Sequence, residues 1–199
     1  MAKTLDMDTQ QLEILARIVR AEEKVQLRLF RVSRLLNEAQ IPYAIIGGHA
    51  VAAWVATKDE SLVRATRDVD VLVKPEDIAR IREVLEADGF IYRHVAEMDI
   101  FLDDSDAKVG DAVHLIFSGR KVRPDHVLPA PDVDNSGIGE DFSVIPLESL
   151  VRTKLVAWRR KDQVHLLDLL GAGVIDASWT HRFQEPLCGR LQELIDNPE

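Results

Sequence analysis

Two aspartates separated by a single valine are the residues of this chain best suited to chemistry. Asp68 and Asp70 begin a run that alternates acidic and apolar residues and turns fully apolar over residues 71–73. Side chains alternate between the two faces of a strand, so the two carboxylates are expected to project side by side. Carboxylates this close repel each other unless they share a hard cation such as Mg²⁺. The pair therefore predicts a metal site and, since Mg²⁺ bridges phosphates in phosphoryl and nucleotidyl transfer, a phosphate substrate.

Two glycines precede the acidic pair. Gly47 and Gly48 end a short apolar run, residues 43–46, and an alanine-rich segment long enough for two helical turns follows them. Glycine lets a backbone pass close to a ligand because it has no β-carbon. The first turn of a helix offers unpaired N–H groups and the positive end of its dipole to an anion. We therefore expect this turn to hold a phosphate, with His49 either touching that phosphate or serving as an ordinary residue of the helix start.

Taken together, these segments resemble the nucleotidyltransferase superfamily that includes DNA polymerase beta. Within it, the resemblance is to small bacterial proteins of the AbiEii-like and MNT-like type. The residues that carry it are the apolar strand ending in Gly47-Gly48, the following helix, and the sequence Arg-x-Thr-x-Asp-Val-Asp over residues 64–70. Residues 150–162 look like the C-terminal helix of these relatives, so the resemblance spans about residues 41–170.

The resemblance implies a reaction and a set of contacts. The implied reaction is the Mg²⁺-dependent transfer of a nucleoside monophosphate from an NTP to a hydroxyl of an acceptor, which is RNA such as tRNA, a protein or a small molecule. Asp68 and Asp70 become the Mg²⁺ ligands and catalytic residues. The residues assigned to the nucleotide and its phosphates are Gly47, Gly48, His49, Arg64, Thr66, Arg67 and Lys154.

The chain departs from the superfamily pattern in two places. Asp68 follows Gly48 by 20 positions, which is longer than in compact members and predicts an extended loop. Relatives also supply a third carboxylate from a later strand, whereas the matching strand here, residues 112–117, has His114 at its polar centre. An imidazole accepts protons near neutral pH but is a poorer Mg²⁺ ligand than a carboxylate. We rank His114 first for the third catalytic position and Asp99, from the preceding strand, second.

Because His114 stands where relatives have a third carboxylate, functions other than catalysed transfer to RNA or protein stay open. In one alternative the fold persists as a catalytically weakened nucleotide-binding module or as one partner of a toxin–antitoxin pair. In another the acceptor is a small molecule, as in the adenylylation of an aminoglycoside. A basic run at Arg152, Lys154, Arg159, Arg160 and Lys161 would give nucleotide or tRNA a local positive surface, or simply be favoured at a helix end.

The elements that must position these residues follow from hydrophobic periodicity. An amphipathic helix is expected over residues 9–39, with an Arg/Lys stripe that is either a solvated face or a docking surface for an acidic partner such as RNA. Strands are expected at 43–46, 68–73, 97–102 and 112–117, and helices at 49–56, 75–87, 147–170 and 176–196. Polar loops are expected at 57–67, 103–111 and 123–142. The predicted fold is α/β (α+β), a small mixed sheet flanked by helices.

Composition sets the outer limits. The 199 residues fit one compact unit: an N-terminal helix (1–40), a nucleotidyltransferase-like core (41–145) and a C-terminal helical segment (146–199). The net charge of −9 excludes a surface that coats nucleic acid uniformly, so any such contact must be local. The single cysteine excludes an internal disulfide, and we find no signal-peptide core and no apolar run near ~20 residues. We therefore expect a cytoplasmic protein without a membrane partner.

Overall fold

The computed structural model describes residues 9–105, 107, 109–134, 138 and 141–198. Residues 1–8, which contain the start of the predicted N-terminal segment, lie outside this range. So do residues 106 and 108 of the predicted loop 103–111, and residues 135–137, 139 and 140 of the predicted loop 123–142.

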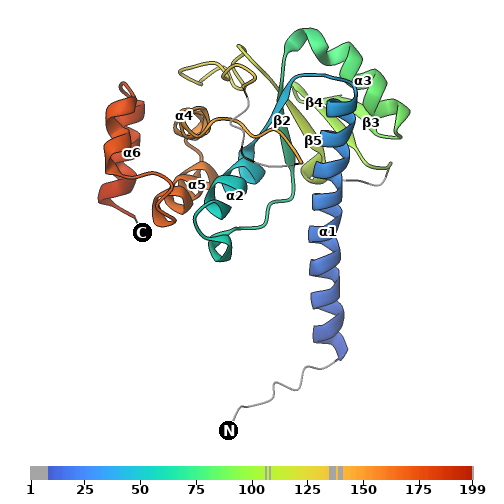
Figure 1. Ribbon diagram of the computed structural model, residues 1–199, viewed down its shortest axis with the longest axis horizontal. Helices are drawn as coiled ribbons and strands as arrows, with labels where there is room; N and C mark the ends of the chain where they lie inside the picture. Colours follow the sequence, from blue (N-terminus) through green and yellow to red (C-terminus); the bar gives the residue numbers. More distant parts are fainter. Residues whose placement is uncertain (1–8, 106, 108, 135–137, 139–140, 199) are drawn as a thin grey trace.

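A five-stranded mixed sheet forms the centre of the molecule (Figure 1). Its strands are β1 (Tyr43–Ile46), β2 (Val69–Val73), β3 (Ile91–Val95), β4 (Met98–Leu102) and β5 (Val113–Phe117). They lie in the order β1-β2-β5-β4-β3, with β2 and β5 parallel and the other neighbours antiparallel. Ile46 pairs with Asp70, which in turn pairs with His114. The strand that leads into the glycines therefore lies beside the acidic strand, and the acidic strand lies beside His114.

Helices cover both faces of this sheet. They are α1 (Thr9–Glu38), α2 (Gly47–Ala56), α3 (Ile78–Ala87), α4 (Leu147–Ala157), α5 (Arg160–Gly171) and α6 (Leu187–Asp196). On one face Val69, Val71 and Val73 pack with α1 and α3. On the other, Leu72 packs with α2, α4, α5 and α6. Strand alternation puts Asp70 on the same face as Leu72, so the acidic pair faces α2 and α5. The predicted mixed α/β fold is confirmed.

Several predicted boundaries are wrong. β3 is not among the expected strands, because it is an edge strand whose exposed Arg93 and His94 interrupt the alternation of apolar residues. The single helix expected over 147–170 is two helices, because Trp158 adopts a left-handed conformation (φ 50°) between α4 and α5. The helix expected over 176–196 begins as a 3₁₀ turn, Ala177–Arg182, and continues as α6 after Pro186.

Ion pairs hold the C-terminal half of α1 against the sheet. Arg28 is buried, and its Nε donates a hydrogen bond of 2.7 Å to Asp103. Lys24 pairs with Asp104, and Arg31 pairs with Asp88 after α3. The expectation of a solvated basic stripe is therefore wrong for Arg28, because the loop after β4 supplies a carboxylate to it.

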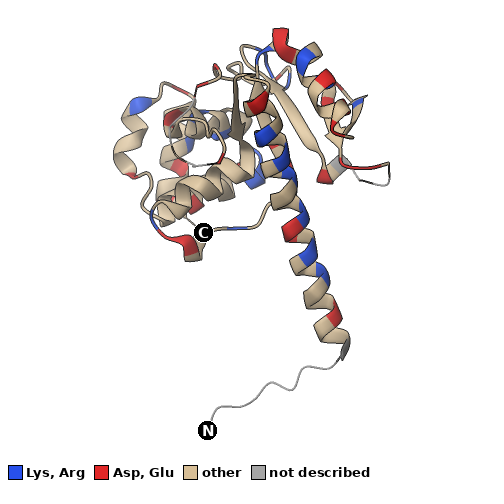
Figure 2. Ribbon diagram, turned by 45° about the vertical axis from the view of Figure 1, so that its right-hand side comes forward, with Lys and Arg blue, Asp and Glu red and all other residues tan. Residues whose placement is uncertain are grey.

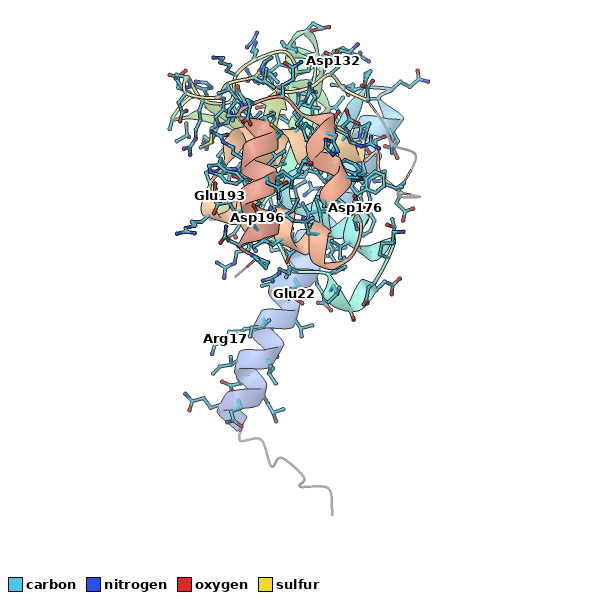
Figure 3. The ribbon with its side chains drawn as sticks, turned by 90° about the vertical axis from the view of Figure 1, so that its left-hand side faces the viewer. Arg17, Glu22, Asp132, Asp176, Glu193 and Asp196 are labelled. Atoms are coloured by element: carbon cyan, nitrogen blue, oxygen red, sulfur yellow. The ribbon has the colours of Figure 1, made fainter. Side chains whose placement is uncertain are left out.

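The N-terminal half of α1 projects away from the rest of the molecule (Figure 1). Acidic and basic residues are interleaved along it (Figure 2), and Figure 3 shows Arg17 and Glu22 on this projecting part. None of the helices in the described part of the chain combines the length and the apolar character needed to cross a membrane.

Candidate active site

Asp68, Asp70 and His114 converge on the face of the sheet that is covered by α2 and α5. Asp68 immediately precedes β2, Asp70 lies within β2, and His114 lies on β5 as the pairing partner of Asp70. The Nδ1 atom of His114 is 3.3 Å from Oδ1 of Asp70 and 3.9 Å from Oδ2 of Asp68. One ligand atom from each residue can be chosen so that all three lie within 4.8 Å of one another.

These three side chains fit a divalent cation. Two carboxylates supply negative charge, and an unprotonated imidazole supplies a nitrogen donor. Adjacent ligands of an octahedral ion with bonds of ~2.1 Å lie about 3 Å apart. The two distances from His114 to the carboxylates, 3.3 and 3.9 Å, exceed this spacing by less than about 1 Å.

Both glycines make room for residues of this group. Gly47 has a positive φ of 71°, and a β-carbon there would lie 2.0 Å from Oδ2 of Asp70. A β-carbon on Gly48 would lie 2.5 Å from Oγ1 of Thr66, whose hydroxyl donates a 3.1 Å hydrogen bond to Asp68. Any larger residue at either position would push the acidic pair or its partner aside. The predicted order of strand, glycine turn and helix is present, with the glycines forming the first turn of α2.

The start of α2 also carries His49. No side chain caps the N-terminus of this helix. The Nε2 atom of His49 is buried and has no hydrogen-bond partner among the described residues. Burial lowers the pKa of His49 more than the charges of Asp68 and Asp70 raise it, so the ring is neutral at neutral pH. The start of α2 therefore carries a neutral imidazole whose buried Nε2 atom has no hydrogen-bond partner among the described residues.

Lys161 is a basic residue that reaches the acidic pair. Its Nζ lies 3.7 Å from Oδ2 of Asp68, and its side chain is 52% exposed. Burial raises the pKa of Asp68, but the charge of Lys161 and the hydrogen bond from Thr66 outweigh this effect and keep that pKa below its usual value. Asp68 is therefore ionised at neutral pH.

Arg64 and Arg67, which are also predicted to contact the nucleotide, bind other partners than the acidic pair in this structure. Arg64 turns to α5, where its Nε donates a 2.8 Å hydrogen bond to Asp168. The backbone oxygen of Arg67 accepts a hydrogen bond from Arg28, and the Arg67 residue itself is exposed. Arg64 thus ties the loop before β2 to the helix that carries Lys161.

Lys154 is buried rather than open to a ligand. Its Nζ lies 3.4 Å from Oδ1 of Asp162, and the two side chains are only 5% and 1% exposed. Arg159 also binds Asp162, through Nε at 2.7 Å. The sequence does not single out Lys161 as the residue that contacts the acidic pair. The turn at Trp158 reorients α5 relative to α4, and such a turn does not change the periodic pattern of apolar residues. The contact of Lys154 to a triphosphate that the resemblance implies stays a prediction, and in this structure its Nζ faces Asp162.

Asp99, the second choice for the third catalytic position, lies on the opposite face of the sheet. It pairs with Leu115, whose side chain packs with α1 and α3, whereas His114 pairs with Ile100. Its carboxylate accepts a hydrogen bond from Tyr92 and lies 3.1 Å from Nδ1 of His94. The second choice is therefore wrong, because strand pairing turns Asp99 away from the acidic pair.

Comparison with known families settles the relationship. Residues 9–127 match the family described as uncharacterised nucleotidyltransferase, and this range includes the glycine turn, the acidic pair and His114. The chain belongs to this nucleotidyltransferase family. No curated protein matches it in sequence.

Solved structures with a similar fold agree with this family. The antigenic nucleotidyltransferase-like protein from Paracoccidioides brasiliensis is 15% identical, with a TM-score of 0.53 over 89% of this chain and 90% of that chain. The antibiotic-resistance factor ANT(2'')-Ia is 13% identical, with a TM-score of 0.51 over 88% of this chain and 91% of that chain. At these identities the likeness shows that the nucleotidyltransferase fold extends over most of the chain.

Proposed function

We propose that this protein transfers a nucleoside monophosphate from an NTP to a hydroxyl of an acceptor and releases pyrophosphate. The observation that carries this proposal is the convergence of Asp68, Asp70 and His114 beside the start of α2 in a member of a nucleotidyltransferase family. In the reaction the acceptor oxygen bonds to the α-phosphorus, the bond to pyrophosphate breaks, and the acceptor hydroxyl loses its proton. When bound, a divalent cation would neutralise the phosphate charge.

The chain's own residues would bind and orient the nucleotide. Asp68, Asp70 and His114 would hold the cation. The uncapped N–H groups of Gly47 and Gly48 at the start of α2 are suited to a phosphate oxygen, because a helix N-terminus attracts anions. Lys161 is placed to contact a phosphate bound beside Asp68. In this proposal Lys161 takes the contact that the family resemblance implies for Lys154.

A cavity between α1 and the loop before β2 is the proposed acceptor site. It encloses about 640 Å³ and is lined by Thr66 and Arg67, immediately before Asp68. This volume lies within the range of about 300–1,000 Å³ that is usual for small-molecule sites. Its charged lining residues, three acidic and three basic, are Glu22, Asp104, Asp111, Lys24, Arg28 and Arg67.

The mixed lining of this cavity bears on the kind of acceptor. Its described side chains carry no net charge, whereas RNA-binding surfaces concentrate Lys and Arg to neutralise phosphates. We therefore propose a small molecule or a protein side chain as acceptor rather than RNA. The narrower kinship with AbiEii-like or MNT-like proteins, the toxin–antitoxin role and the cytoplasmic location stay predictions.

A transfer assay tests the proposed function. The full chain is incubated with each α-³²P-labelled NTP, Mg²⁺ or Mn²⁺, and in separate reactions total RNA, proteins of a cell lysate or a panel of aminoglycosides. Labelled acceptor formed by the wild type and lost in Asp70→Asn supports the proposal and identifies the acceptor class. Tight binding of an NTP without transfer to any acceptor would instead support the nucleotide-binding module.

A further inference from the structure

In the group formed by Asp68, Asp70 and His114, the histidine supplies a nitrogen ligand, whereas the two aspartates supply oxygen ligands. We propose that His114 makes this site selective for a first-row transition-metal ion, with Mn²⁺ preferred over Mg²⁺. The inference rests on the proposed function in that it concerns the same site, but it addresses only which cation the residues hold.

The backbone determines which atom His114 presents. Its neighbours Val113 and Leu115 are buried in the core beneath α1 and α3, so strand alternation points His114 to the opposite face. The side chain is 15% exposed, and Nδ1 is the ring nitrogen that lies 3.3 Å from Asp70 and 3.9 Å from Asp68. The imidazole is therefore held at the site by the same pairing of β2 with β5 that positions the acids.

Three described carboxylates of neighbouring elements, Asp99, Asp162 and Asp168, are engaged elsewhere. Asp99 faces the other side of the sheet, with Tyr92 and His94. On α5, Asp162 is bound by Lys154 and Arg159, and Asp168 is bound by Arg64. Among the described residues, the group able to close on one ion consists of Asp68, Asp70 and His114.

The chemistry of the ions converts this donor set into a preference. Mg²⁺ takes oxygen ligands in near-ideal octahedral geometry and gives up its water reluctantly. Imidazole suits the later first-row ions, and affinity for mixed nitrogen and oxygen sites rises from Mn²⁺ through Fe²⁺ and Co²⁺. A nitrogen in the third position therefore penalises Mg²⁺ more than Mn²⁺, which accepts both carboxylate and imidazole ligands.

Electron paramagnetic resonance of the metal-free full chain titrated with Mn²⁺ tests this inference. The signal of free Mn²⁺ gives the affinity, competition by Mg²⁺ gives the selectivity, and spin-echo modulation from ¹⁴N reports a directly bound nitrogen. We expect the modulation in the wild type and its loss in His114→Asp, with the ratio of Mn²⁺ to Mg²⁺ affinity falling because an oxygen donor replaces the nitrogen donor. His94→Ala, which removes a histidine beside Asp99 on the other face without adding a carboxylate, should change neither quantity.

Each outcome bears on the inference. Absence of Mn²⁺ binding, absence of nitrogen modulation in the wild type, or modulation and selectivity that persist in His114→Asp would overturn it. If His114→Asp does not fold, wild-type protein labelled with [¹⁵N]histidine decides, because a bound histidine must replace the ¹⁴N modulation with that of ¹⁵N. Transfer that runs on Mg²⁺ without a histidine signal would refute the inference and leave the proposed function. Selective Mn²⁺ binding without transfer from any NTP would support the inference and refute the proposed function.

Discussion

Replacing Asp162 with alanine should destabilise the protein strongly, because it leaves a buried ammonium group without its carboxylate. Lys154 on α4 and Asp162 on α5 are 3.4 Å apart and almost fully buried beside the candidate active site. Burial lowers the pKa of Lys154, and the charges of Asp162 and Asp70 offset only part of that effect. Without Asp162, the lysine must either stay charged in the core or lose its proton, and both cost free energy.

The expected magnitude follows from the burial of this ion pair. Removing one partner of a buried ion pair costs about 3–5 kcal/mol. For a domain of this size, 1 kcal/mol of unfolding free energy corresponds to about 2–4 °C in Tm, so Tm should fall by about 6–20 °C. Lys154→Met should cost less, about 1–2 kcal/mol, because Asp162 keeps Arg159 at 2.7 Å and methionine retains the apolar stem of lysine.

Urea unfolding followed by circular dichroism measures both free energies, and the double variant completes the cycle. We expect Asp162→Ala to cost much less in the Lys154→Met background. Because a neutral amine is cheaper to bury, the deficit of Asp162→Ala should also be smaller at about pH 9 than at about pH 7. Equal costs for the two single variants, or a deficit of Asp162→Ala below about 1 kcal/mol, would refute this reasoning.

Three further predictions concern single side chains around the site. Gly48→Ala should weaken Mn²⁺ binding by about tenfold in a calorimetric titration, because its β-carbon displaces the Thr66 hydroxyl from Asp68; unchanged affinity would contradict the role given to this glycine. Lys161→Ala should raise KM for the NTP by about tenfold while leaving Tm nearly unchanged, since the side chain is exposed; a fall in Tm with constant KM would make Lys161 a structural residue. Burial, with the charge of Lys154, lowers the pKa of His165 to about 4, so the folded state resists its protonation and stability should fall as pH drops from 6.5 towards 4. His165→Leu should lose this part of the pH dependence of Tm, and an identical slope in both proteins would show that His165 does not cause it.

The local part of the site could be predicted from the sequence. Asp68 and Asp70 alternate with apolar residues, and Gly47 and Gly48 follow an apolar run, so their strand and turn show in the residue pattern itself. His114 could be assigned to the site only because the family resemblance expects a third catalytic residue on a later strand, here residues 112–117. The strand and the turn themselves depend on short-range periodicity, which a sequence displays directly.

The remaining residues depend on long-range pairing. Asp99 could not be assigned to a face without the register of β4 against β5, since a shift of one residue reverses every side chain. Lys161 reaches Asp68 only because Trp158 breaks the helix before it, and a single left-handed residue leaves the apolar pattern intact. The burial of Arg28 likewise depends on Asp103, which lies 75 positions away in the sequence.

Nucleotide binding by Asp70→Asn tests the central claim most directly. A non-hydrolysable NTP analogue is titrated calorimetrically into the wild type and the variant, with and without Mn²⁺, and Asp99→Asn serves as the same substitution on the opposite face of the sheet. The account predicts cation-dependent binding in the wild type and in Asp99→Asn, weakened by at least about tenfold in Asp70→Asn because one ligand charge of the cation is lost. Equal cation-dependent binding by the wild type and Asp70→Asn would contradict it.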